Sequence, residues 1–437
     1  MEQHLLCVDI GTSSLKAALI GDEGSIFASC RIGFPRQGST DAAVYWFEAF
    51  CDAAHRLSAA GTELAGTGAA GLAAGIVISG NGPTVTAVSE REPESNLCPY
   101  TLLWNVPAEV PSQGSSTSLF IPRFNLLSKL APEQWNAARY ILSGPEYLIW
   151  RLTGTAVTIL PEERFRPAYW TDAALAENGI DRDRLPPFVP PGFRAGHLTA
   201  EAAEALGLPQ KVPVYCGAPD WIAALIGTDT LSPGRACDRA GTSEGLNVCV
   251  PAPLTAQDIR TLPSIIPGLF NAGYLLPSTG KRFSDYRRSS RFRDISPEES
   301  MKLIRTSQEE SEERRLVNGI AFEVRQGTEA LRKAGADFAA LRLSGGQARN
   351  APWNQLKADV LGIPLELTGS PDGELIGDAV IGFTGMGRFG SIAEGAGKLV
   401  SVSQVFHPDA KAHARYSGLY QQWLEAGETG IPPRENR

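Results

Sequence analysis

The sequence predicts an α/β protein built from two related domains, and three observations carry this prediction. Residues 5–20 hold two apolar runs separated by a turn of glycine, threonine and serine. A similar strand, Gly-Thr-Ser turn and strand recur at 236–250. Amphipathic helical patterns alternate with short apolar runs, as expected when helices cover sheets. The recurrence favours an internal duplication, although Gly-Thr-Ser tripeptides also recur by chance.

Composition excludes several classes of protein. The chain has 437 residues, of which 43% are hydrophobic, and a net charge of −8, which argues against a nucleic-acid partner. Its seven cysteines include no C-x-x-C pair, so we expect buried thiols in a reducing cytosol and no zinc site. The first residues lack the basic region of a signal peptide, and no apolar run is long enough to cross a membrane. We therefore expect a cytoplasmic protein without a membrane partner.

The first domain is predicted to begin with a meander of strands. Strands are expected over 5–10, 15–20 and 26–32, followed by an amphipathic helix over 46–64 and a buried strand over 75–80. Because the hydroxyl turn lies between two strands, it matches neither a P-loop nor a Rossmann glycine motif, both of which open a helix.

The middle of the chain is predicted to be helical and then irregular. Helical patterns run over 121–153, including Tyr140-Ile141-Leu142, and end at Gly154. The proline-rich stretch 185–192 is expected to be a loop that continues neither a helix nor a strand ladder. A short helix follows over 201–206.

The second half repeats the alternation of strand and helix. A strand over 212–217 leads to Asp220 and a helix from Trp221, and we place the domains at 1–229 and 230–437. The charged segment 280–313 is expected to be a solvated helix face, and the tail from Gln421 to be disordered. Later elements are predicted over 236–241, 246–250, 317–334, 341–344, 354–361, 365–367 and, as a glycine-rich helix that packs closely, 377–387.

The first turn has the groups that bind a polyphosphate with a divalent cation. Gly11 allows close approach of the backbone, and the N–H groups and hydroxyls of 12–14 can bind phosphate oxygens. Lys16 adds positive charge, and Asp9 can hold Mg²⁺ directly or through water. The alternative is a hairpin turn that satisfies only its own backbone.

Four separated segments together resemble the FGGY carbohydrate kinases, of the xylulokinase-like kind. They are 9–14, 216–220, 241–243 and 344–350, the last followed by 353–362. The resemblance covers nearly the whole chain and implies an actin-like (ribonuclease H-like) ATPase fold. In that fold two duplicated domains flank a nucleotide cleft, with the sugar side in the first domain and the nucleotide side in the second.

The resemblance also implies roles for single residues in ATP-dependent phosphorylation of a sugar, polyol or sugar-acid hydroxyl. Asp220 would be the general base and Asp9 would position Mg²⁺ through water. Asp220 could instead be a plain helix N-cap, and Gly345-Gly346 an ordinary turn. The phosphate and nucleotide contacts would come from Gly11, Thr12, Ser13, Ser14, Lys16, Gly241, Thr242, Gly345, Gly346 and Asn350.

The chain departs from the family pattern where the sugar should bind. Residues 79–84 read Ser-Gly-Asn-Gly-Pro-Thr where the family often has Gly-Gln-Met-His-Gly, and 104–108 read Trp-Asn-Val-Pro-Ala in place of Trp-x-Asp-x-Arg. The acidic and basic sugar contacts are therefore missing. The candidate substrate residues are Asn81, Trp104, Asn105 and Trp221, although indoles are more often core residues.

These departures leave an alternative: a catalytically impaired relative that binds a nucleotide or a sugar. Retention of Asp9 and Asp220 argues against it, because a binder needs no base. An actin-like chaperone ATPase is a third class, but no long β-rich module follows the second domain. The expected partner is a small-molecule sugar or polyol. A homodimer is the candidate assembly, but the sequence does not determine the oligomeric state.

Overall fold

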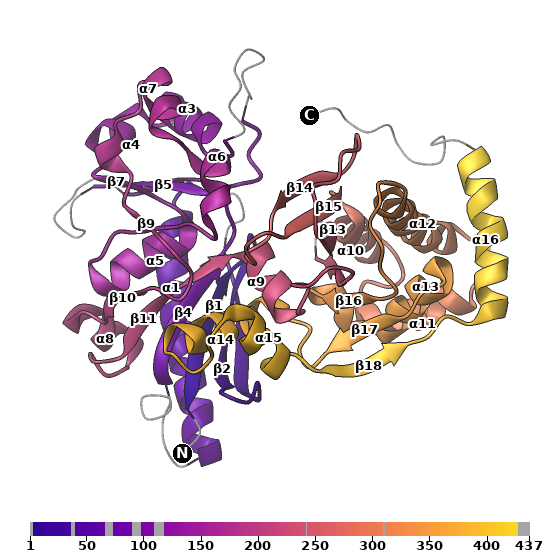
Figure 1. Ribbon diagram of the computed structural model, residues 1–437. Coiled ribbons are helices and arrows are strands. Elements are labelled where there is room, and N and C mark those ends of the chain that lie inside the picture. The colour runs from indigo at the N-terminus through magenta and orange to yellow at the C-terminus, as the bar shows by residue number, and fades with distance from the viewer. Residues whose placement is uncertain are drawn as a thin grey trace. The chain divides into compact units, whose positions relative to one another are not determined.

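The computed structural model describes residues 3–35, 40–65, 73–89, 98–108, 118–241, 243–308 and 311–426. These residues form two compact units (Figure 1). The first unit contains Met1–Gly227 and Glu374–Leu399, and the second contains Thr228–Gly373 and Val400–Arg437. Among the described residues no helix is both long and apolar enough to cross a membrane.

The first unit is built on a six-stranded mixed sheet in the order β10-β11-β4-β1-β2-β3. The central strand β1 pairs antiparallel with β2 and parallel with β4, which in turn pairs parallel with β11. The strands are β1 (His4–Ile10), β2 (Ser14–Gly21), β3 (Ile26–Gly33), β4 (Ala73–Gly80), β10 (Arg194–His197) and β11 (Pro213–Pro219).

Helices cover both faces of this sheet because its central strands are apolar on both sides. On one face Leu6, Val8 and Ile10 pack against α1 (Ala42–Ala65) and α5 (Gly144–Thr153). On the other face lies α14 (Gly373–Gly385), whose Gly382 leaves so little room that a Cβ there would come within 2.4 Å of Val77. The segment 374–399, which the sequence analysis placed in the second domain, therefore packs in the first unit.

The remaining elements of the first unit form smaller layers beside the main sheet (Figure 1). A three-stranded sheet has the order β6-β5-β7, and β8 pairs with β9. The bounds are β5 (Val85–Val88), β6 (Tyr100–Leu102), α3 (Ile121–Leu130), α4 (Pro132–Ala137), β7 (Tyr140–Leu142), β8 (Thr158–Ile159), α6 (Arg166–Tyr169), α7 (Asp172–Glu177), β9 (Phe188–Val189), α8 (Ala200–Leu206), α9 (Asp220–Gly227) and α15 (Ile392–Leu399).

The sheet of the second unit repeats the pairing pattern of the first. Its order is β14-β15-β13-β12-β16-β17-β18, where β12 pairs antiparallel with β13 and parallel with β16. The series β3-β2-β1-β4-β11 and β15-β13-β12-β16-β17 have the same succession of antiparallel and parallel pairs. The recurring strand, turn and strand of the sequence thus stand at the same place in both sheets.

Helices α12 and α13 cover the apolar face of this second sheet, where Leu246 and Val248 are buried. Basic residues in and just after α10 are engaged within the unit: Arg282 of the helix with Glu323, and Arg291, which follows the helix, with Glu313 at 2.8 Å. The bounds are β12 (Ala236–Ala240), β13 (Glu244–Val250), β14 (Arg260–Pro263), β15 (Phe270–Leu276), α10 (Thr279–Ser289), α11 (Pro297–Thr306), α12 (Glu312–Lys333), β16 (Leu341–Ser344), α13 (Ala351–Leu361), β17 (Leu365–Thr368), β18 (Val402–Phe406) and α16 (Ala410–Glu425).

Three local expectations are wrong. Tyr140–Leu142 is a strand, β7, because it pairs with β5, which periodicity cannot reveal. Phe188–Val189 forms a short parallel ladder with β8 despite the flanking prolines, since Pro187 and Val189 supply carbonyls rather than N–H groups. Gln421–Glu425 belongs to α16, where Tyr420 packs against Phe322.

Candidate active site

Three polar residues lie in one row across the first sheet, at the carboxyl ends of β1 and β4. Pairing sets Lys16 of β2 opposite Asp9 of β1, and Asp9 opposite Ser79 of β4. Directly paired residues point to the same face of a sheet. The ammonium of Lys16 lies 3.1 Å from Asp9 Oδ2, and the row therefore begins with a largely buried ion pair.

Helix α14 places two carboxylates in contact with this row. Glu374 and Asp378 are one turn apart and so share a face of the helix. Glu374 Oε2 lies 3.2 Å from Lys16 Nζ, and Asp378 accepts a hydrogen bond from the hydroxyl of Ser79. Gly377 makes this approach feasible, because a Cβ at that position would lie 1.9 Å from the carbonyl oxygen of Ala223 in α9.

Asp9 is electrostatically poised to receive a cation. Burial, together with the nearby charges of Glu374 and Asp220, raises the pKa of Asp9 to about 7, although Lys16 acts in the opposite direction. Its second oxygen, Oδ1, is buried without a hydrogen-bond partner. One lysine thus faces several carboxylates, and an added positive charge near Asp9 Oδ1 would relieve their repulsion.

Asp220 stands where β11 ends and α9 begins. Its Oδ1 accepts a hydrogen bond of 2.7 Å from the amide of Trp221, and its side chain is half-buried. Its charge acts on Asp9, so the two carboxylates share one electrostatic environment. The N-cap alternative and a role in chemistry remain compatible at this position.

The first hydroxyl turn is closed by its own backbone. The amide of Gly11 donates to the carbonyl of Ser14 at 3.0 Å. Ser13 is exposed and Ser14 is buried, so their hydroxyls face different surroundings. Thr12 accepts a hydrogen bond of 2.9 Å from the indole Nε1 of Trp104. The turn therefore meets one of the predicted substrate residues.

A hydrogen-bonded chain that runs through Trp104 joins a further substrate candidate, Asn81, to this turn. The hydroxyl of Thr84 donates to Asn81 Oδ1 at 2.8 Å and accepts from the amide of Trp104 at 3.1 Å. The Nδ2 atom of Asn81 is buried without a hydrogen-bond partner. Asn105 is exposed beside Trp104, whereas the ring of Trp221 lies 6.1 Å from that of Phe165.

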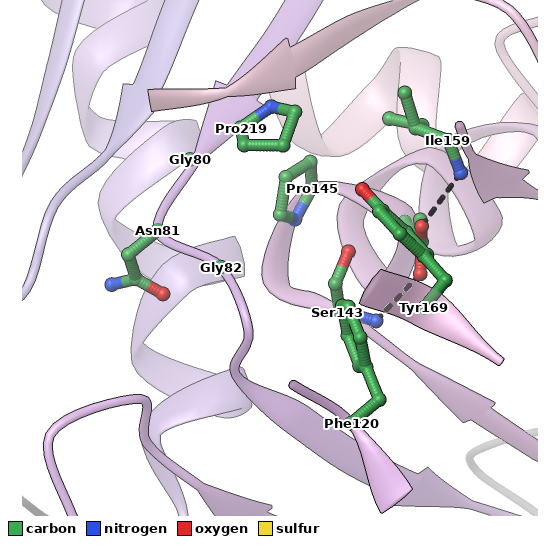
Figure 2. Close-up of a pocket in the computed structure, with 10 residues that line it drawn as sticks. Gly80, Asn81, Gly82, Phe120, Ser143, Pro145, Ile159, Tyr169 and Pro219 are labelled. Carbon is green, nitrogen blue, oxygen red and sulfur yellow. Dashed lines mark hydrogen bonds between the residues drawn. The ribbon is translucent and has the colours of Figure 1, made fainter. Parts of the chain in front are cut away.

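A pocket opens beside these residues, at the ends of β4 and β11 (Figure 2). Its empty space, including the part open to solvent, is about 280 Å³. Figure 2 shows the carboxamide of Asn81 on the far side of its backbone from Ser143 and Pro145. The lining residues are Gly80, Asn81, Gly82, Phe120, Ser143, Pro145, Glu146, Ile159, Tyr169 and Pro219.

Glu146 is the charged side chain of the pocket lining, and both of its carboxylate oxygens accept hydrogen bonds from backbone amides. Its two oxygens accept hydrogen bonds of 2.7 Å from the amides of Ser143 and Ile159. Burial raises its pKa to about 7, although these bonds lower it. Because both oxygens are engaged, Glu146 joins α5 to β8 and is a structural member of the site.

The predicted nucleotide residues of the second unit also converge. The carbonyl of Gly241 accepts a hydrogen bond of 2.9 Å from Gln347. Gly345 has a φ of 91°, and a Cβ there would lie 2.5 Å from the carbonyl oxygen of Ala240. Gly346 follows at the start of a short 3₁₀ turn, Gly346–Arg349. Thr242 lies outside the described residues.

Asn350, a predicted nucleotide contact, is the N-cap of α13. Its Oδ1 accepts from the amide of Trp353 at 3.2 Å, and its Nδ2 donates to the carbonyl of Pro297 at 3.0 Å. Its carboxamide is thereby buried in contacts within the second unit. Any contact with a nucleotide would use the remaining hydrogen-bonding capacity of these two atoms.

A buried charge cluster lies beside the second hydroxyl turn. Lys357 of α13 bonds Asp238 of β12, and its ammonium lies 3.1 Å from Glu244 at the start of β13. All three side chains are at most 1% exposed. Burial lowers the pKa of Lys357, but the two carboxylates outweigh this effect and raise it to about 12. Burial, with Glu244, raises the pKa of Asp238 to about 8.

Glu374, Asp378 and Lys357 were not predicted as site residues from the sequence. Two carboxylates four residues apart in an apolar, glycine-rich helix were a usable signal, since such a helix packs closely and charges on it are costly unless paired. Lys357 had no comparable signal. Only the fold brings it to Asp238 and Glu244, which are more than one hundred positions away along the chain.

Comparison with known proteins shows the family of the chain. Residues 117–227 match the N-terminal domain of the FGGY family of carbohydrate kinases, and residues 239–386 match its C-terminal domain. A xylulose kinase of Lactococcus lactis is 24% identical over 480 aligned positions, covering 97% of this chain and 96% of the relative.

Solved structures show the same fold. The ligand-bound xylulose kinase of Lactobacillus acidophilus has a TM-score of 0.79 at 17% identity, with 98% of each chain covered. The glycerol kinase of Plasmodium falciparum with ADP has a TM-score of 0.76 at 16% identity, with 99% of each chain covered. The predicted actin-like ATPase fold is confirmed, and the chain belongs to the FGGY family of carbohydrate kinases.

Proposed function

We propose that this kinase transfers the γ-phosphoryl group of ATP to a hydroxyl of a neutral sugar or polyol, with Asp220 as the general base. The observation that carries the proposal is the convergence of Asp9, Lys16 and Asp220 beside a pocket in one unit. Phosphoryl transfer needs mainly positioning and charge stabilisation, and these residue types supply both.

Asp220 is the natural proton acceptor of this group. It is half-buried, begins α9 and directly follows Pro219, which lines the pocket. A hydroxyl in the pocket would thus lie near a carboxylate. General-base help of this kind contributes about 10²- to 10⁴-fold to rate.

Mg²⁺ fits the residues around Asp9. The buried Oδ1 of Asp9 lacks a partner, and the surrounding carboxylates favour an added cation. Among the described residues no three His, Cys, Asp or Glu side chains form a metal site. Mg²⁺ does not require one, because it commonly binds one or two carboxylates, several waters and substrate phosphates. When bound, it would offset the negative charge of the phosphates.

The phosphates would be held by residues of both hydroxyl turns. In the first unit these are Gly11, Thr12, Ser13 and Ser14, with Lys16 beside them, and in the second Gly241, Thr242, Gly345 and Gly346. Asn350 is kept as a nucleotide contact only through its remaining hydrogen-bonding capacity. Lys16 already bonds Asp9 and Glu374, so it would reach a phosphate by sharing its ammonium protons.

We propose a neutral acceptor because the pocket lining offers no free charged group. Apart from Glu146, whose oxygens are taken, its lining is apolar or uncharged. Asn81, Trp104, Asn105 and Trp221 are the residues that we propose for acceptor contacts. The names of similar proteins include xylulose kinase, which makes ketoses the first acceptors to try.

An acceptor screen tests the proposed function. ADP release is measured with the wild-type protein, Mg²⁺-ATP and panels of ketoses, aldoses, polyols and sugar acids. We expect release that depends on one neutral acceptor class. ATP binding without turnover on any panel would favour the binding-protein alternative, and rapid release without an acceptor would favour an ATPase.

A further inference from the structure

Strand β11 departs from regular pairing with β4 just before Asp220. Cys216 lies opposite Ile78, and the next pair is Pro219 with Gly80. Two residues of β11, Gly217 and Ala218, therefore face the single residue Ser79. This arrangement is a β-bulge, which leaves the extra residue without a ladder partner and re-aims the chain that follows.

Ser79 satisfies the amide that the bulge leaves unpaired. The N–H of Ala218 donates to Ser79 Oγ at 2.9 Å. The proton of the same hydroxyl is donated to Asp378 on α14. Ser79 and Asp378 are fully buried, so water cannot take the place of either partner without entering the core.

The surroundings leave the bulge little freedom. A Cβ at Gly217 would lie 2.4 Å from both Ser79 Oγ and the carbonyl oxygen of Ile78. Helix α14 also packs closely on α9, the helix that begins at Asp220. The contact is made by Gly377 of α14 and Ala223 of α9. The position of Asp220 is thus tied to α14 along two routes, one through the bulge and one through α9.

We propose that Ser79 and Asp378 are positioning residues that fix the bulge of β11 and, through it, the carboxylate of Asp220. The inference rests on the proposed function, because it takes Asp220 as the base. Neither residue needs to touch the acceptor: Asp378 orients the hydroxyl of Ser79, and Ser79 holds the amide of Ala218, two residues from Asp220.

The protonation of Asp378 decides which variants are informative. Burial raises the pKa of Asp378 well above its usual range, although the bond from Ser79 lowers it. A neutral carboxyl still accepts the Ser79 proton through its carbonyl oxygen, and so does an asparagine amide. Asp378→Asn should therefore preserve the link, whereas Asp378→Ala and Ser79→Ala should each break it.

Steady-state kinetics with an accepted substrate tests the proposal. We expect Ser79→Ala and Asp378→Ala each to lower kcat about 10- to 100-fold, because a small misplacement of a reacting group has effects of this size. The KM for ATP should change less than about twofold, and Asp378→Asn should stay within about threefold of wild-type kcat. The double alanine variant should be no slower than the slower single variant, since both act along one path.

Thr328→Ala is the matched control for loss of a buried hydroxyl. Thr328 of α12 donates to the carbonyl of Arg325 at 2.7 Å and belongs to the second unit. The kcat of Thr328→Ala should equal that of the wild type. Additive losses in the double variant, an Asp378→Asn variant as slow as Asp378→Ala, or an unchanged kcat in Ser79→Ala would overturn the proposal.

Hydrogen exchange separates this proposal from the proposed function. If the wild type turned over no acceptor, the proposed function would fail, yet the bulge could still be examined. Exchange of the peptide spanning 213–219 should accelerate in both alanine variants and not in Asp378→Asn. Unchanged exchange in all three variants would contradict the positioning role, whatever the activity. A variant that fails to fold is recognised by loss of exchange protection throughout the first unit. In that case Asp378→Asn is compared with the wild type, and equal exchange of 213–219 in the two proteins is the expected result.

Discussion

Replacing Lys357 with methionine should destabilise the second unit strongly. The substitution keeps the length of the side chain and removes its charge. Lys357 is the cation shared by Asp238 and Glu244, and all three side chains are at most 1% exposed. Without it, two carboxyl groups stay buried beside each other with no opposite charge.

The expected magnitude follows from that burial. Removing one partner of a buried ion pair costs about 3–5 kcal/mol of unfolding free energy, because the remaining charge is uncompensated. The loss should grow with pH. The pKa of Asp238 is already raised to about 8 and should rise further without the lysine. The folded variant then binds protons more tightly than the unfolded chain, so its stability falls as pH increases.

Urea unfolding and native-state hydrogen exchange measure this effect. The amides of β12 and β13 report on the second unit, and those of β1 and β2 give an internal reference in the first. Lys398→Met is the matched control, because Lys398 pairs with Glu394 at 2.7 Å but is 58% exposed. The unfolding free energy of Lys398→Met should be less than about 1 kcal/mol below that of the wild type.

Two results would refute the reasoning. One is a Lys357→Met variant whose unfolding free energy stays within about 1 kcal/mol of the wild type at pH 9. The other concerns the triple variant Lys357→Met, Asp238→Asn, Glu244→Gln, which removes all three charges. It should recover most of the lost stability, and an equal loss in the triple variant would show that packing, not charge, is responsible.

Two further predictions concern the first unit. Gly377→Ala should lower the unfolding free energy by about 3 kcal/mol or more, because the new Cβ would lie 1.9 Å from a backbone oxygen. Gly397→Ala is the control, because its Cβ would meet open space, and it should raise the unfolding free energy by about 0.5–1 kcal/mol. Thermal or urea unfolding measures both changes. Equal effects of the two would contradict the packing of α14 on α9. Glu146→Gln should remove a fall in stability that the wild type shows between pH 4.5 and about 7, because the raised pKa of Glu146 makes the folded state bind its proton more tightly. An identical pH dependence in both proteins would exclude Glu146 as its source.

Much of the architecture could be predicted because it depends on local patterns. The two apolar runs of 5–20 and the turn between them predict β1 and β2, and the same pattern at 236–250 predicts β12 and β13. Gly154 ends α5 in the left-handed conformation, as a glycine after a helical pattern predicts. These features need no knowledge of distant contacts.

Other features depend on contacts between distant segments and could not be predicted this way. Tyr140–Leu142 is a strand only because β5 lies beside it. The bulge before Asp220 is set by Ser79 and by Asp378, almost three hundred positions further along the chain than Ser79. Segment 374–399 packs with the first unit because Gly377 and Gly382 fit against it. A local pattern carries no information on such pairings.

The kinetics of Asp220→Asn test the central claim most directly. The variant keeps the size of the side chain and removes its ability to accept a proton. Acceptor-dependent kcat should fall about 10²- to 10⁴-fold, the usual contribution of a general base, while calorimetry should show unchanged ATP affinity. A variant that turns over the same acceptor at the wild-type rate would contradict the assignment of Asp220 as the base.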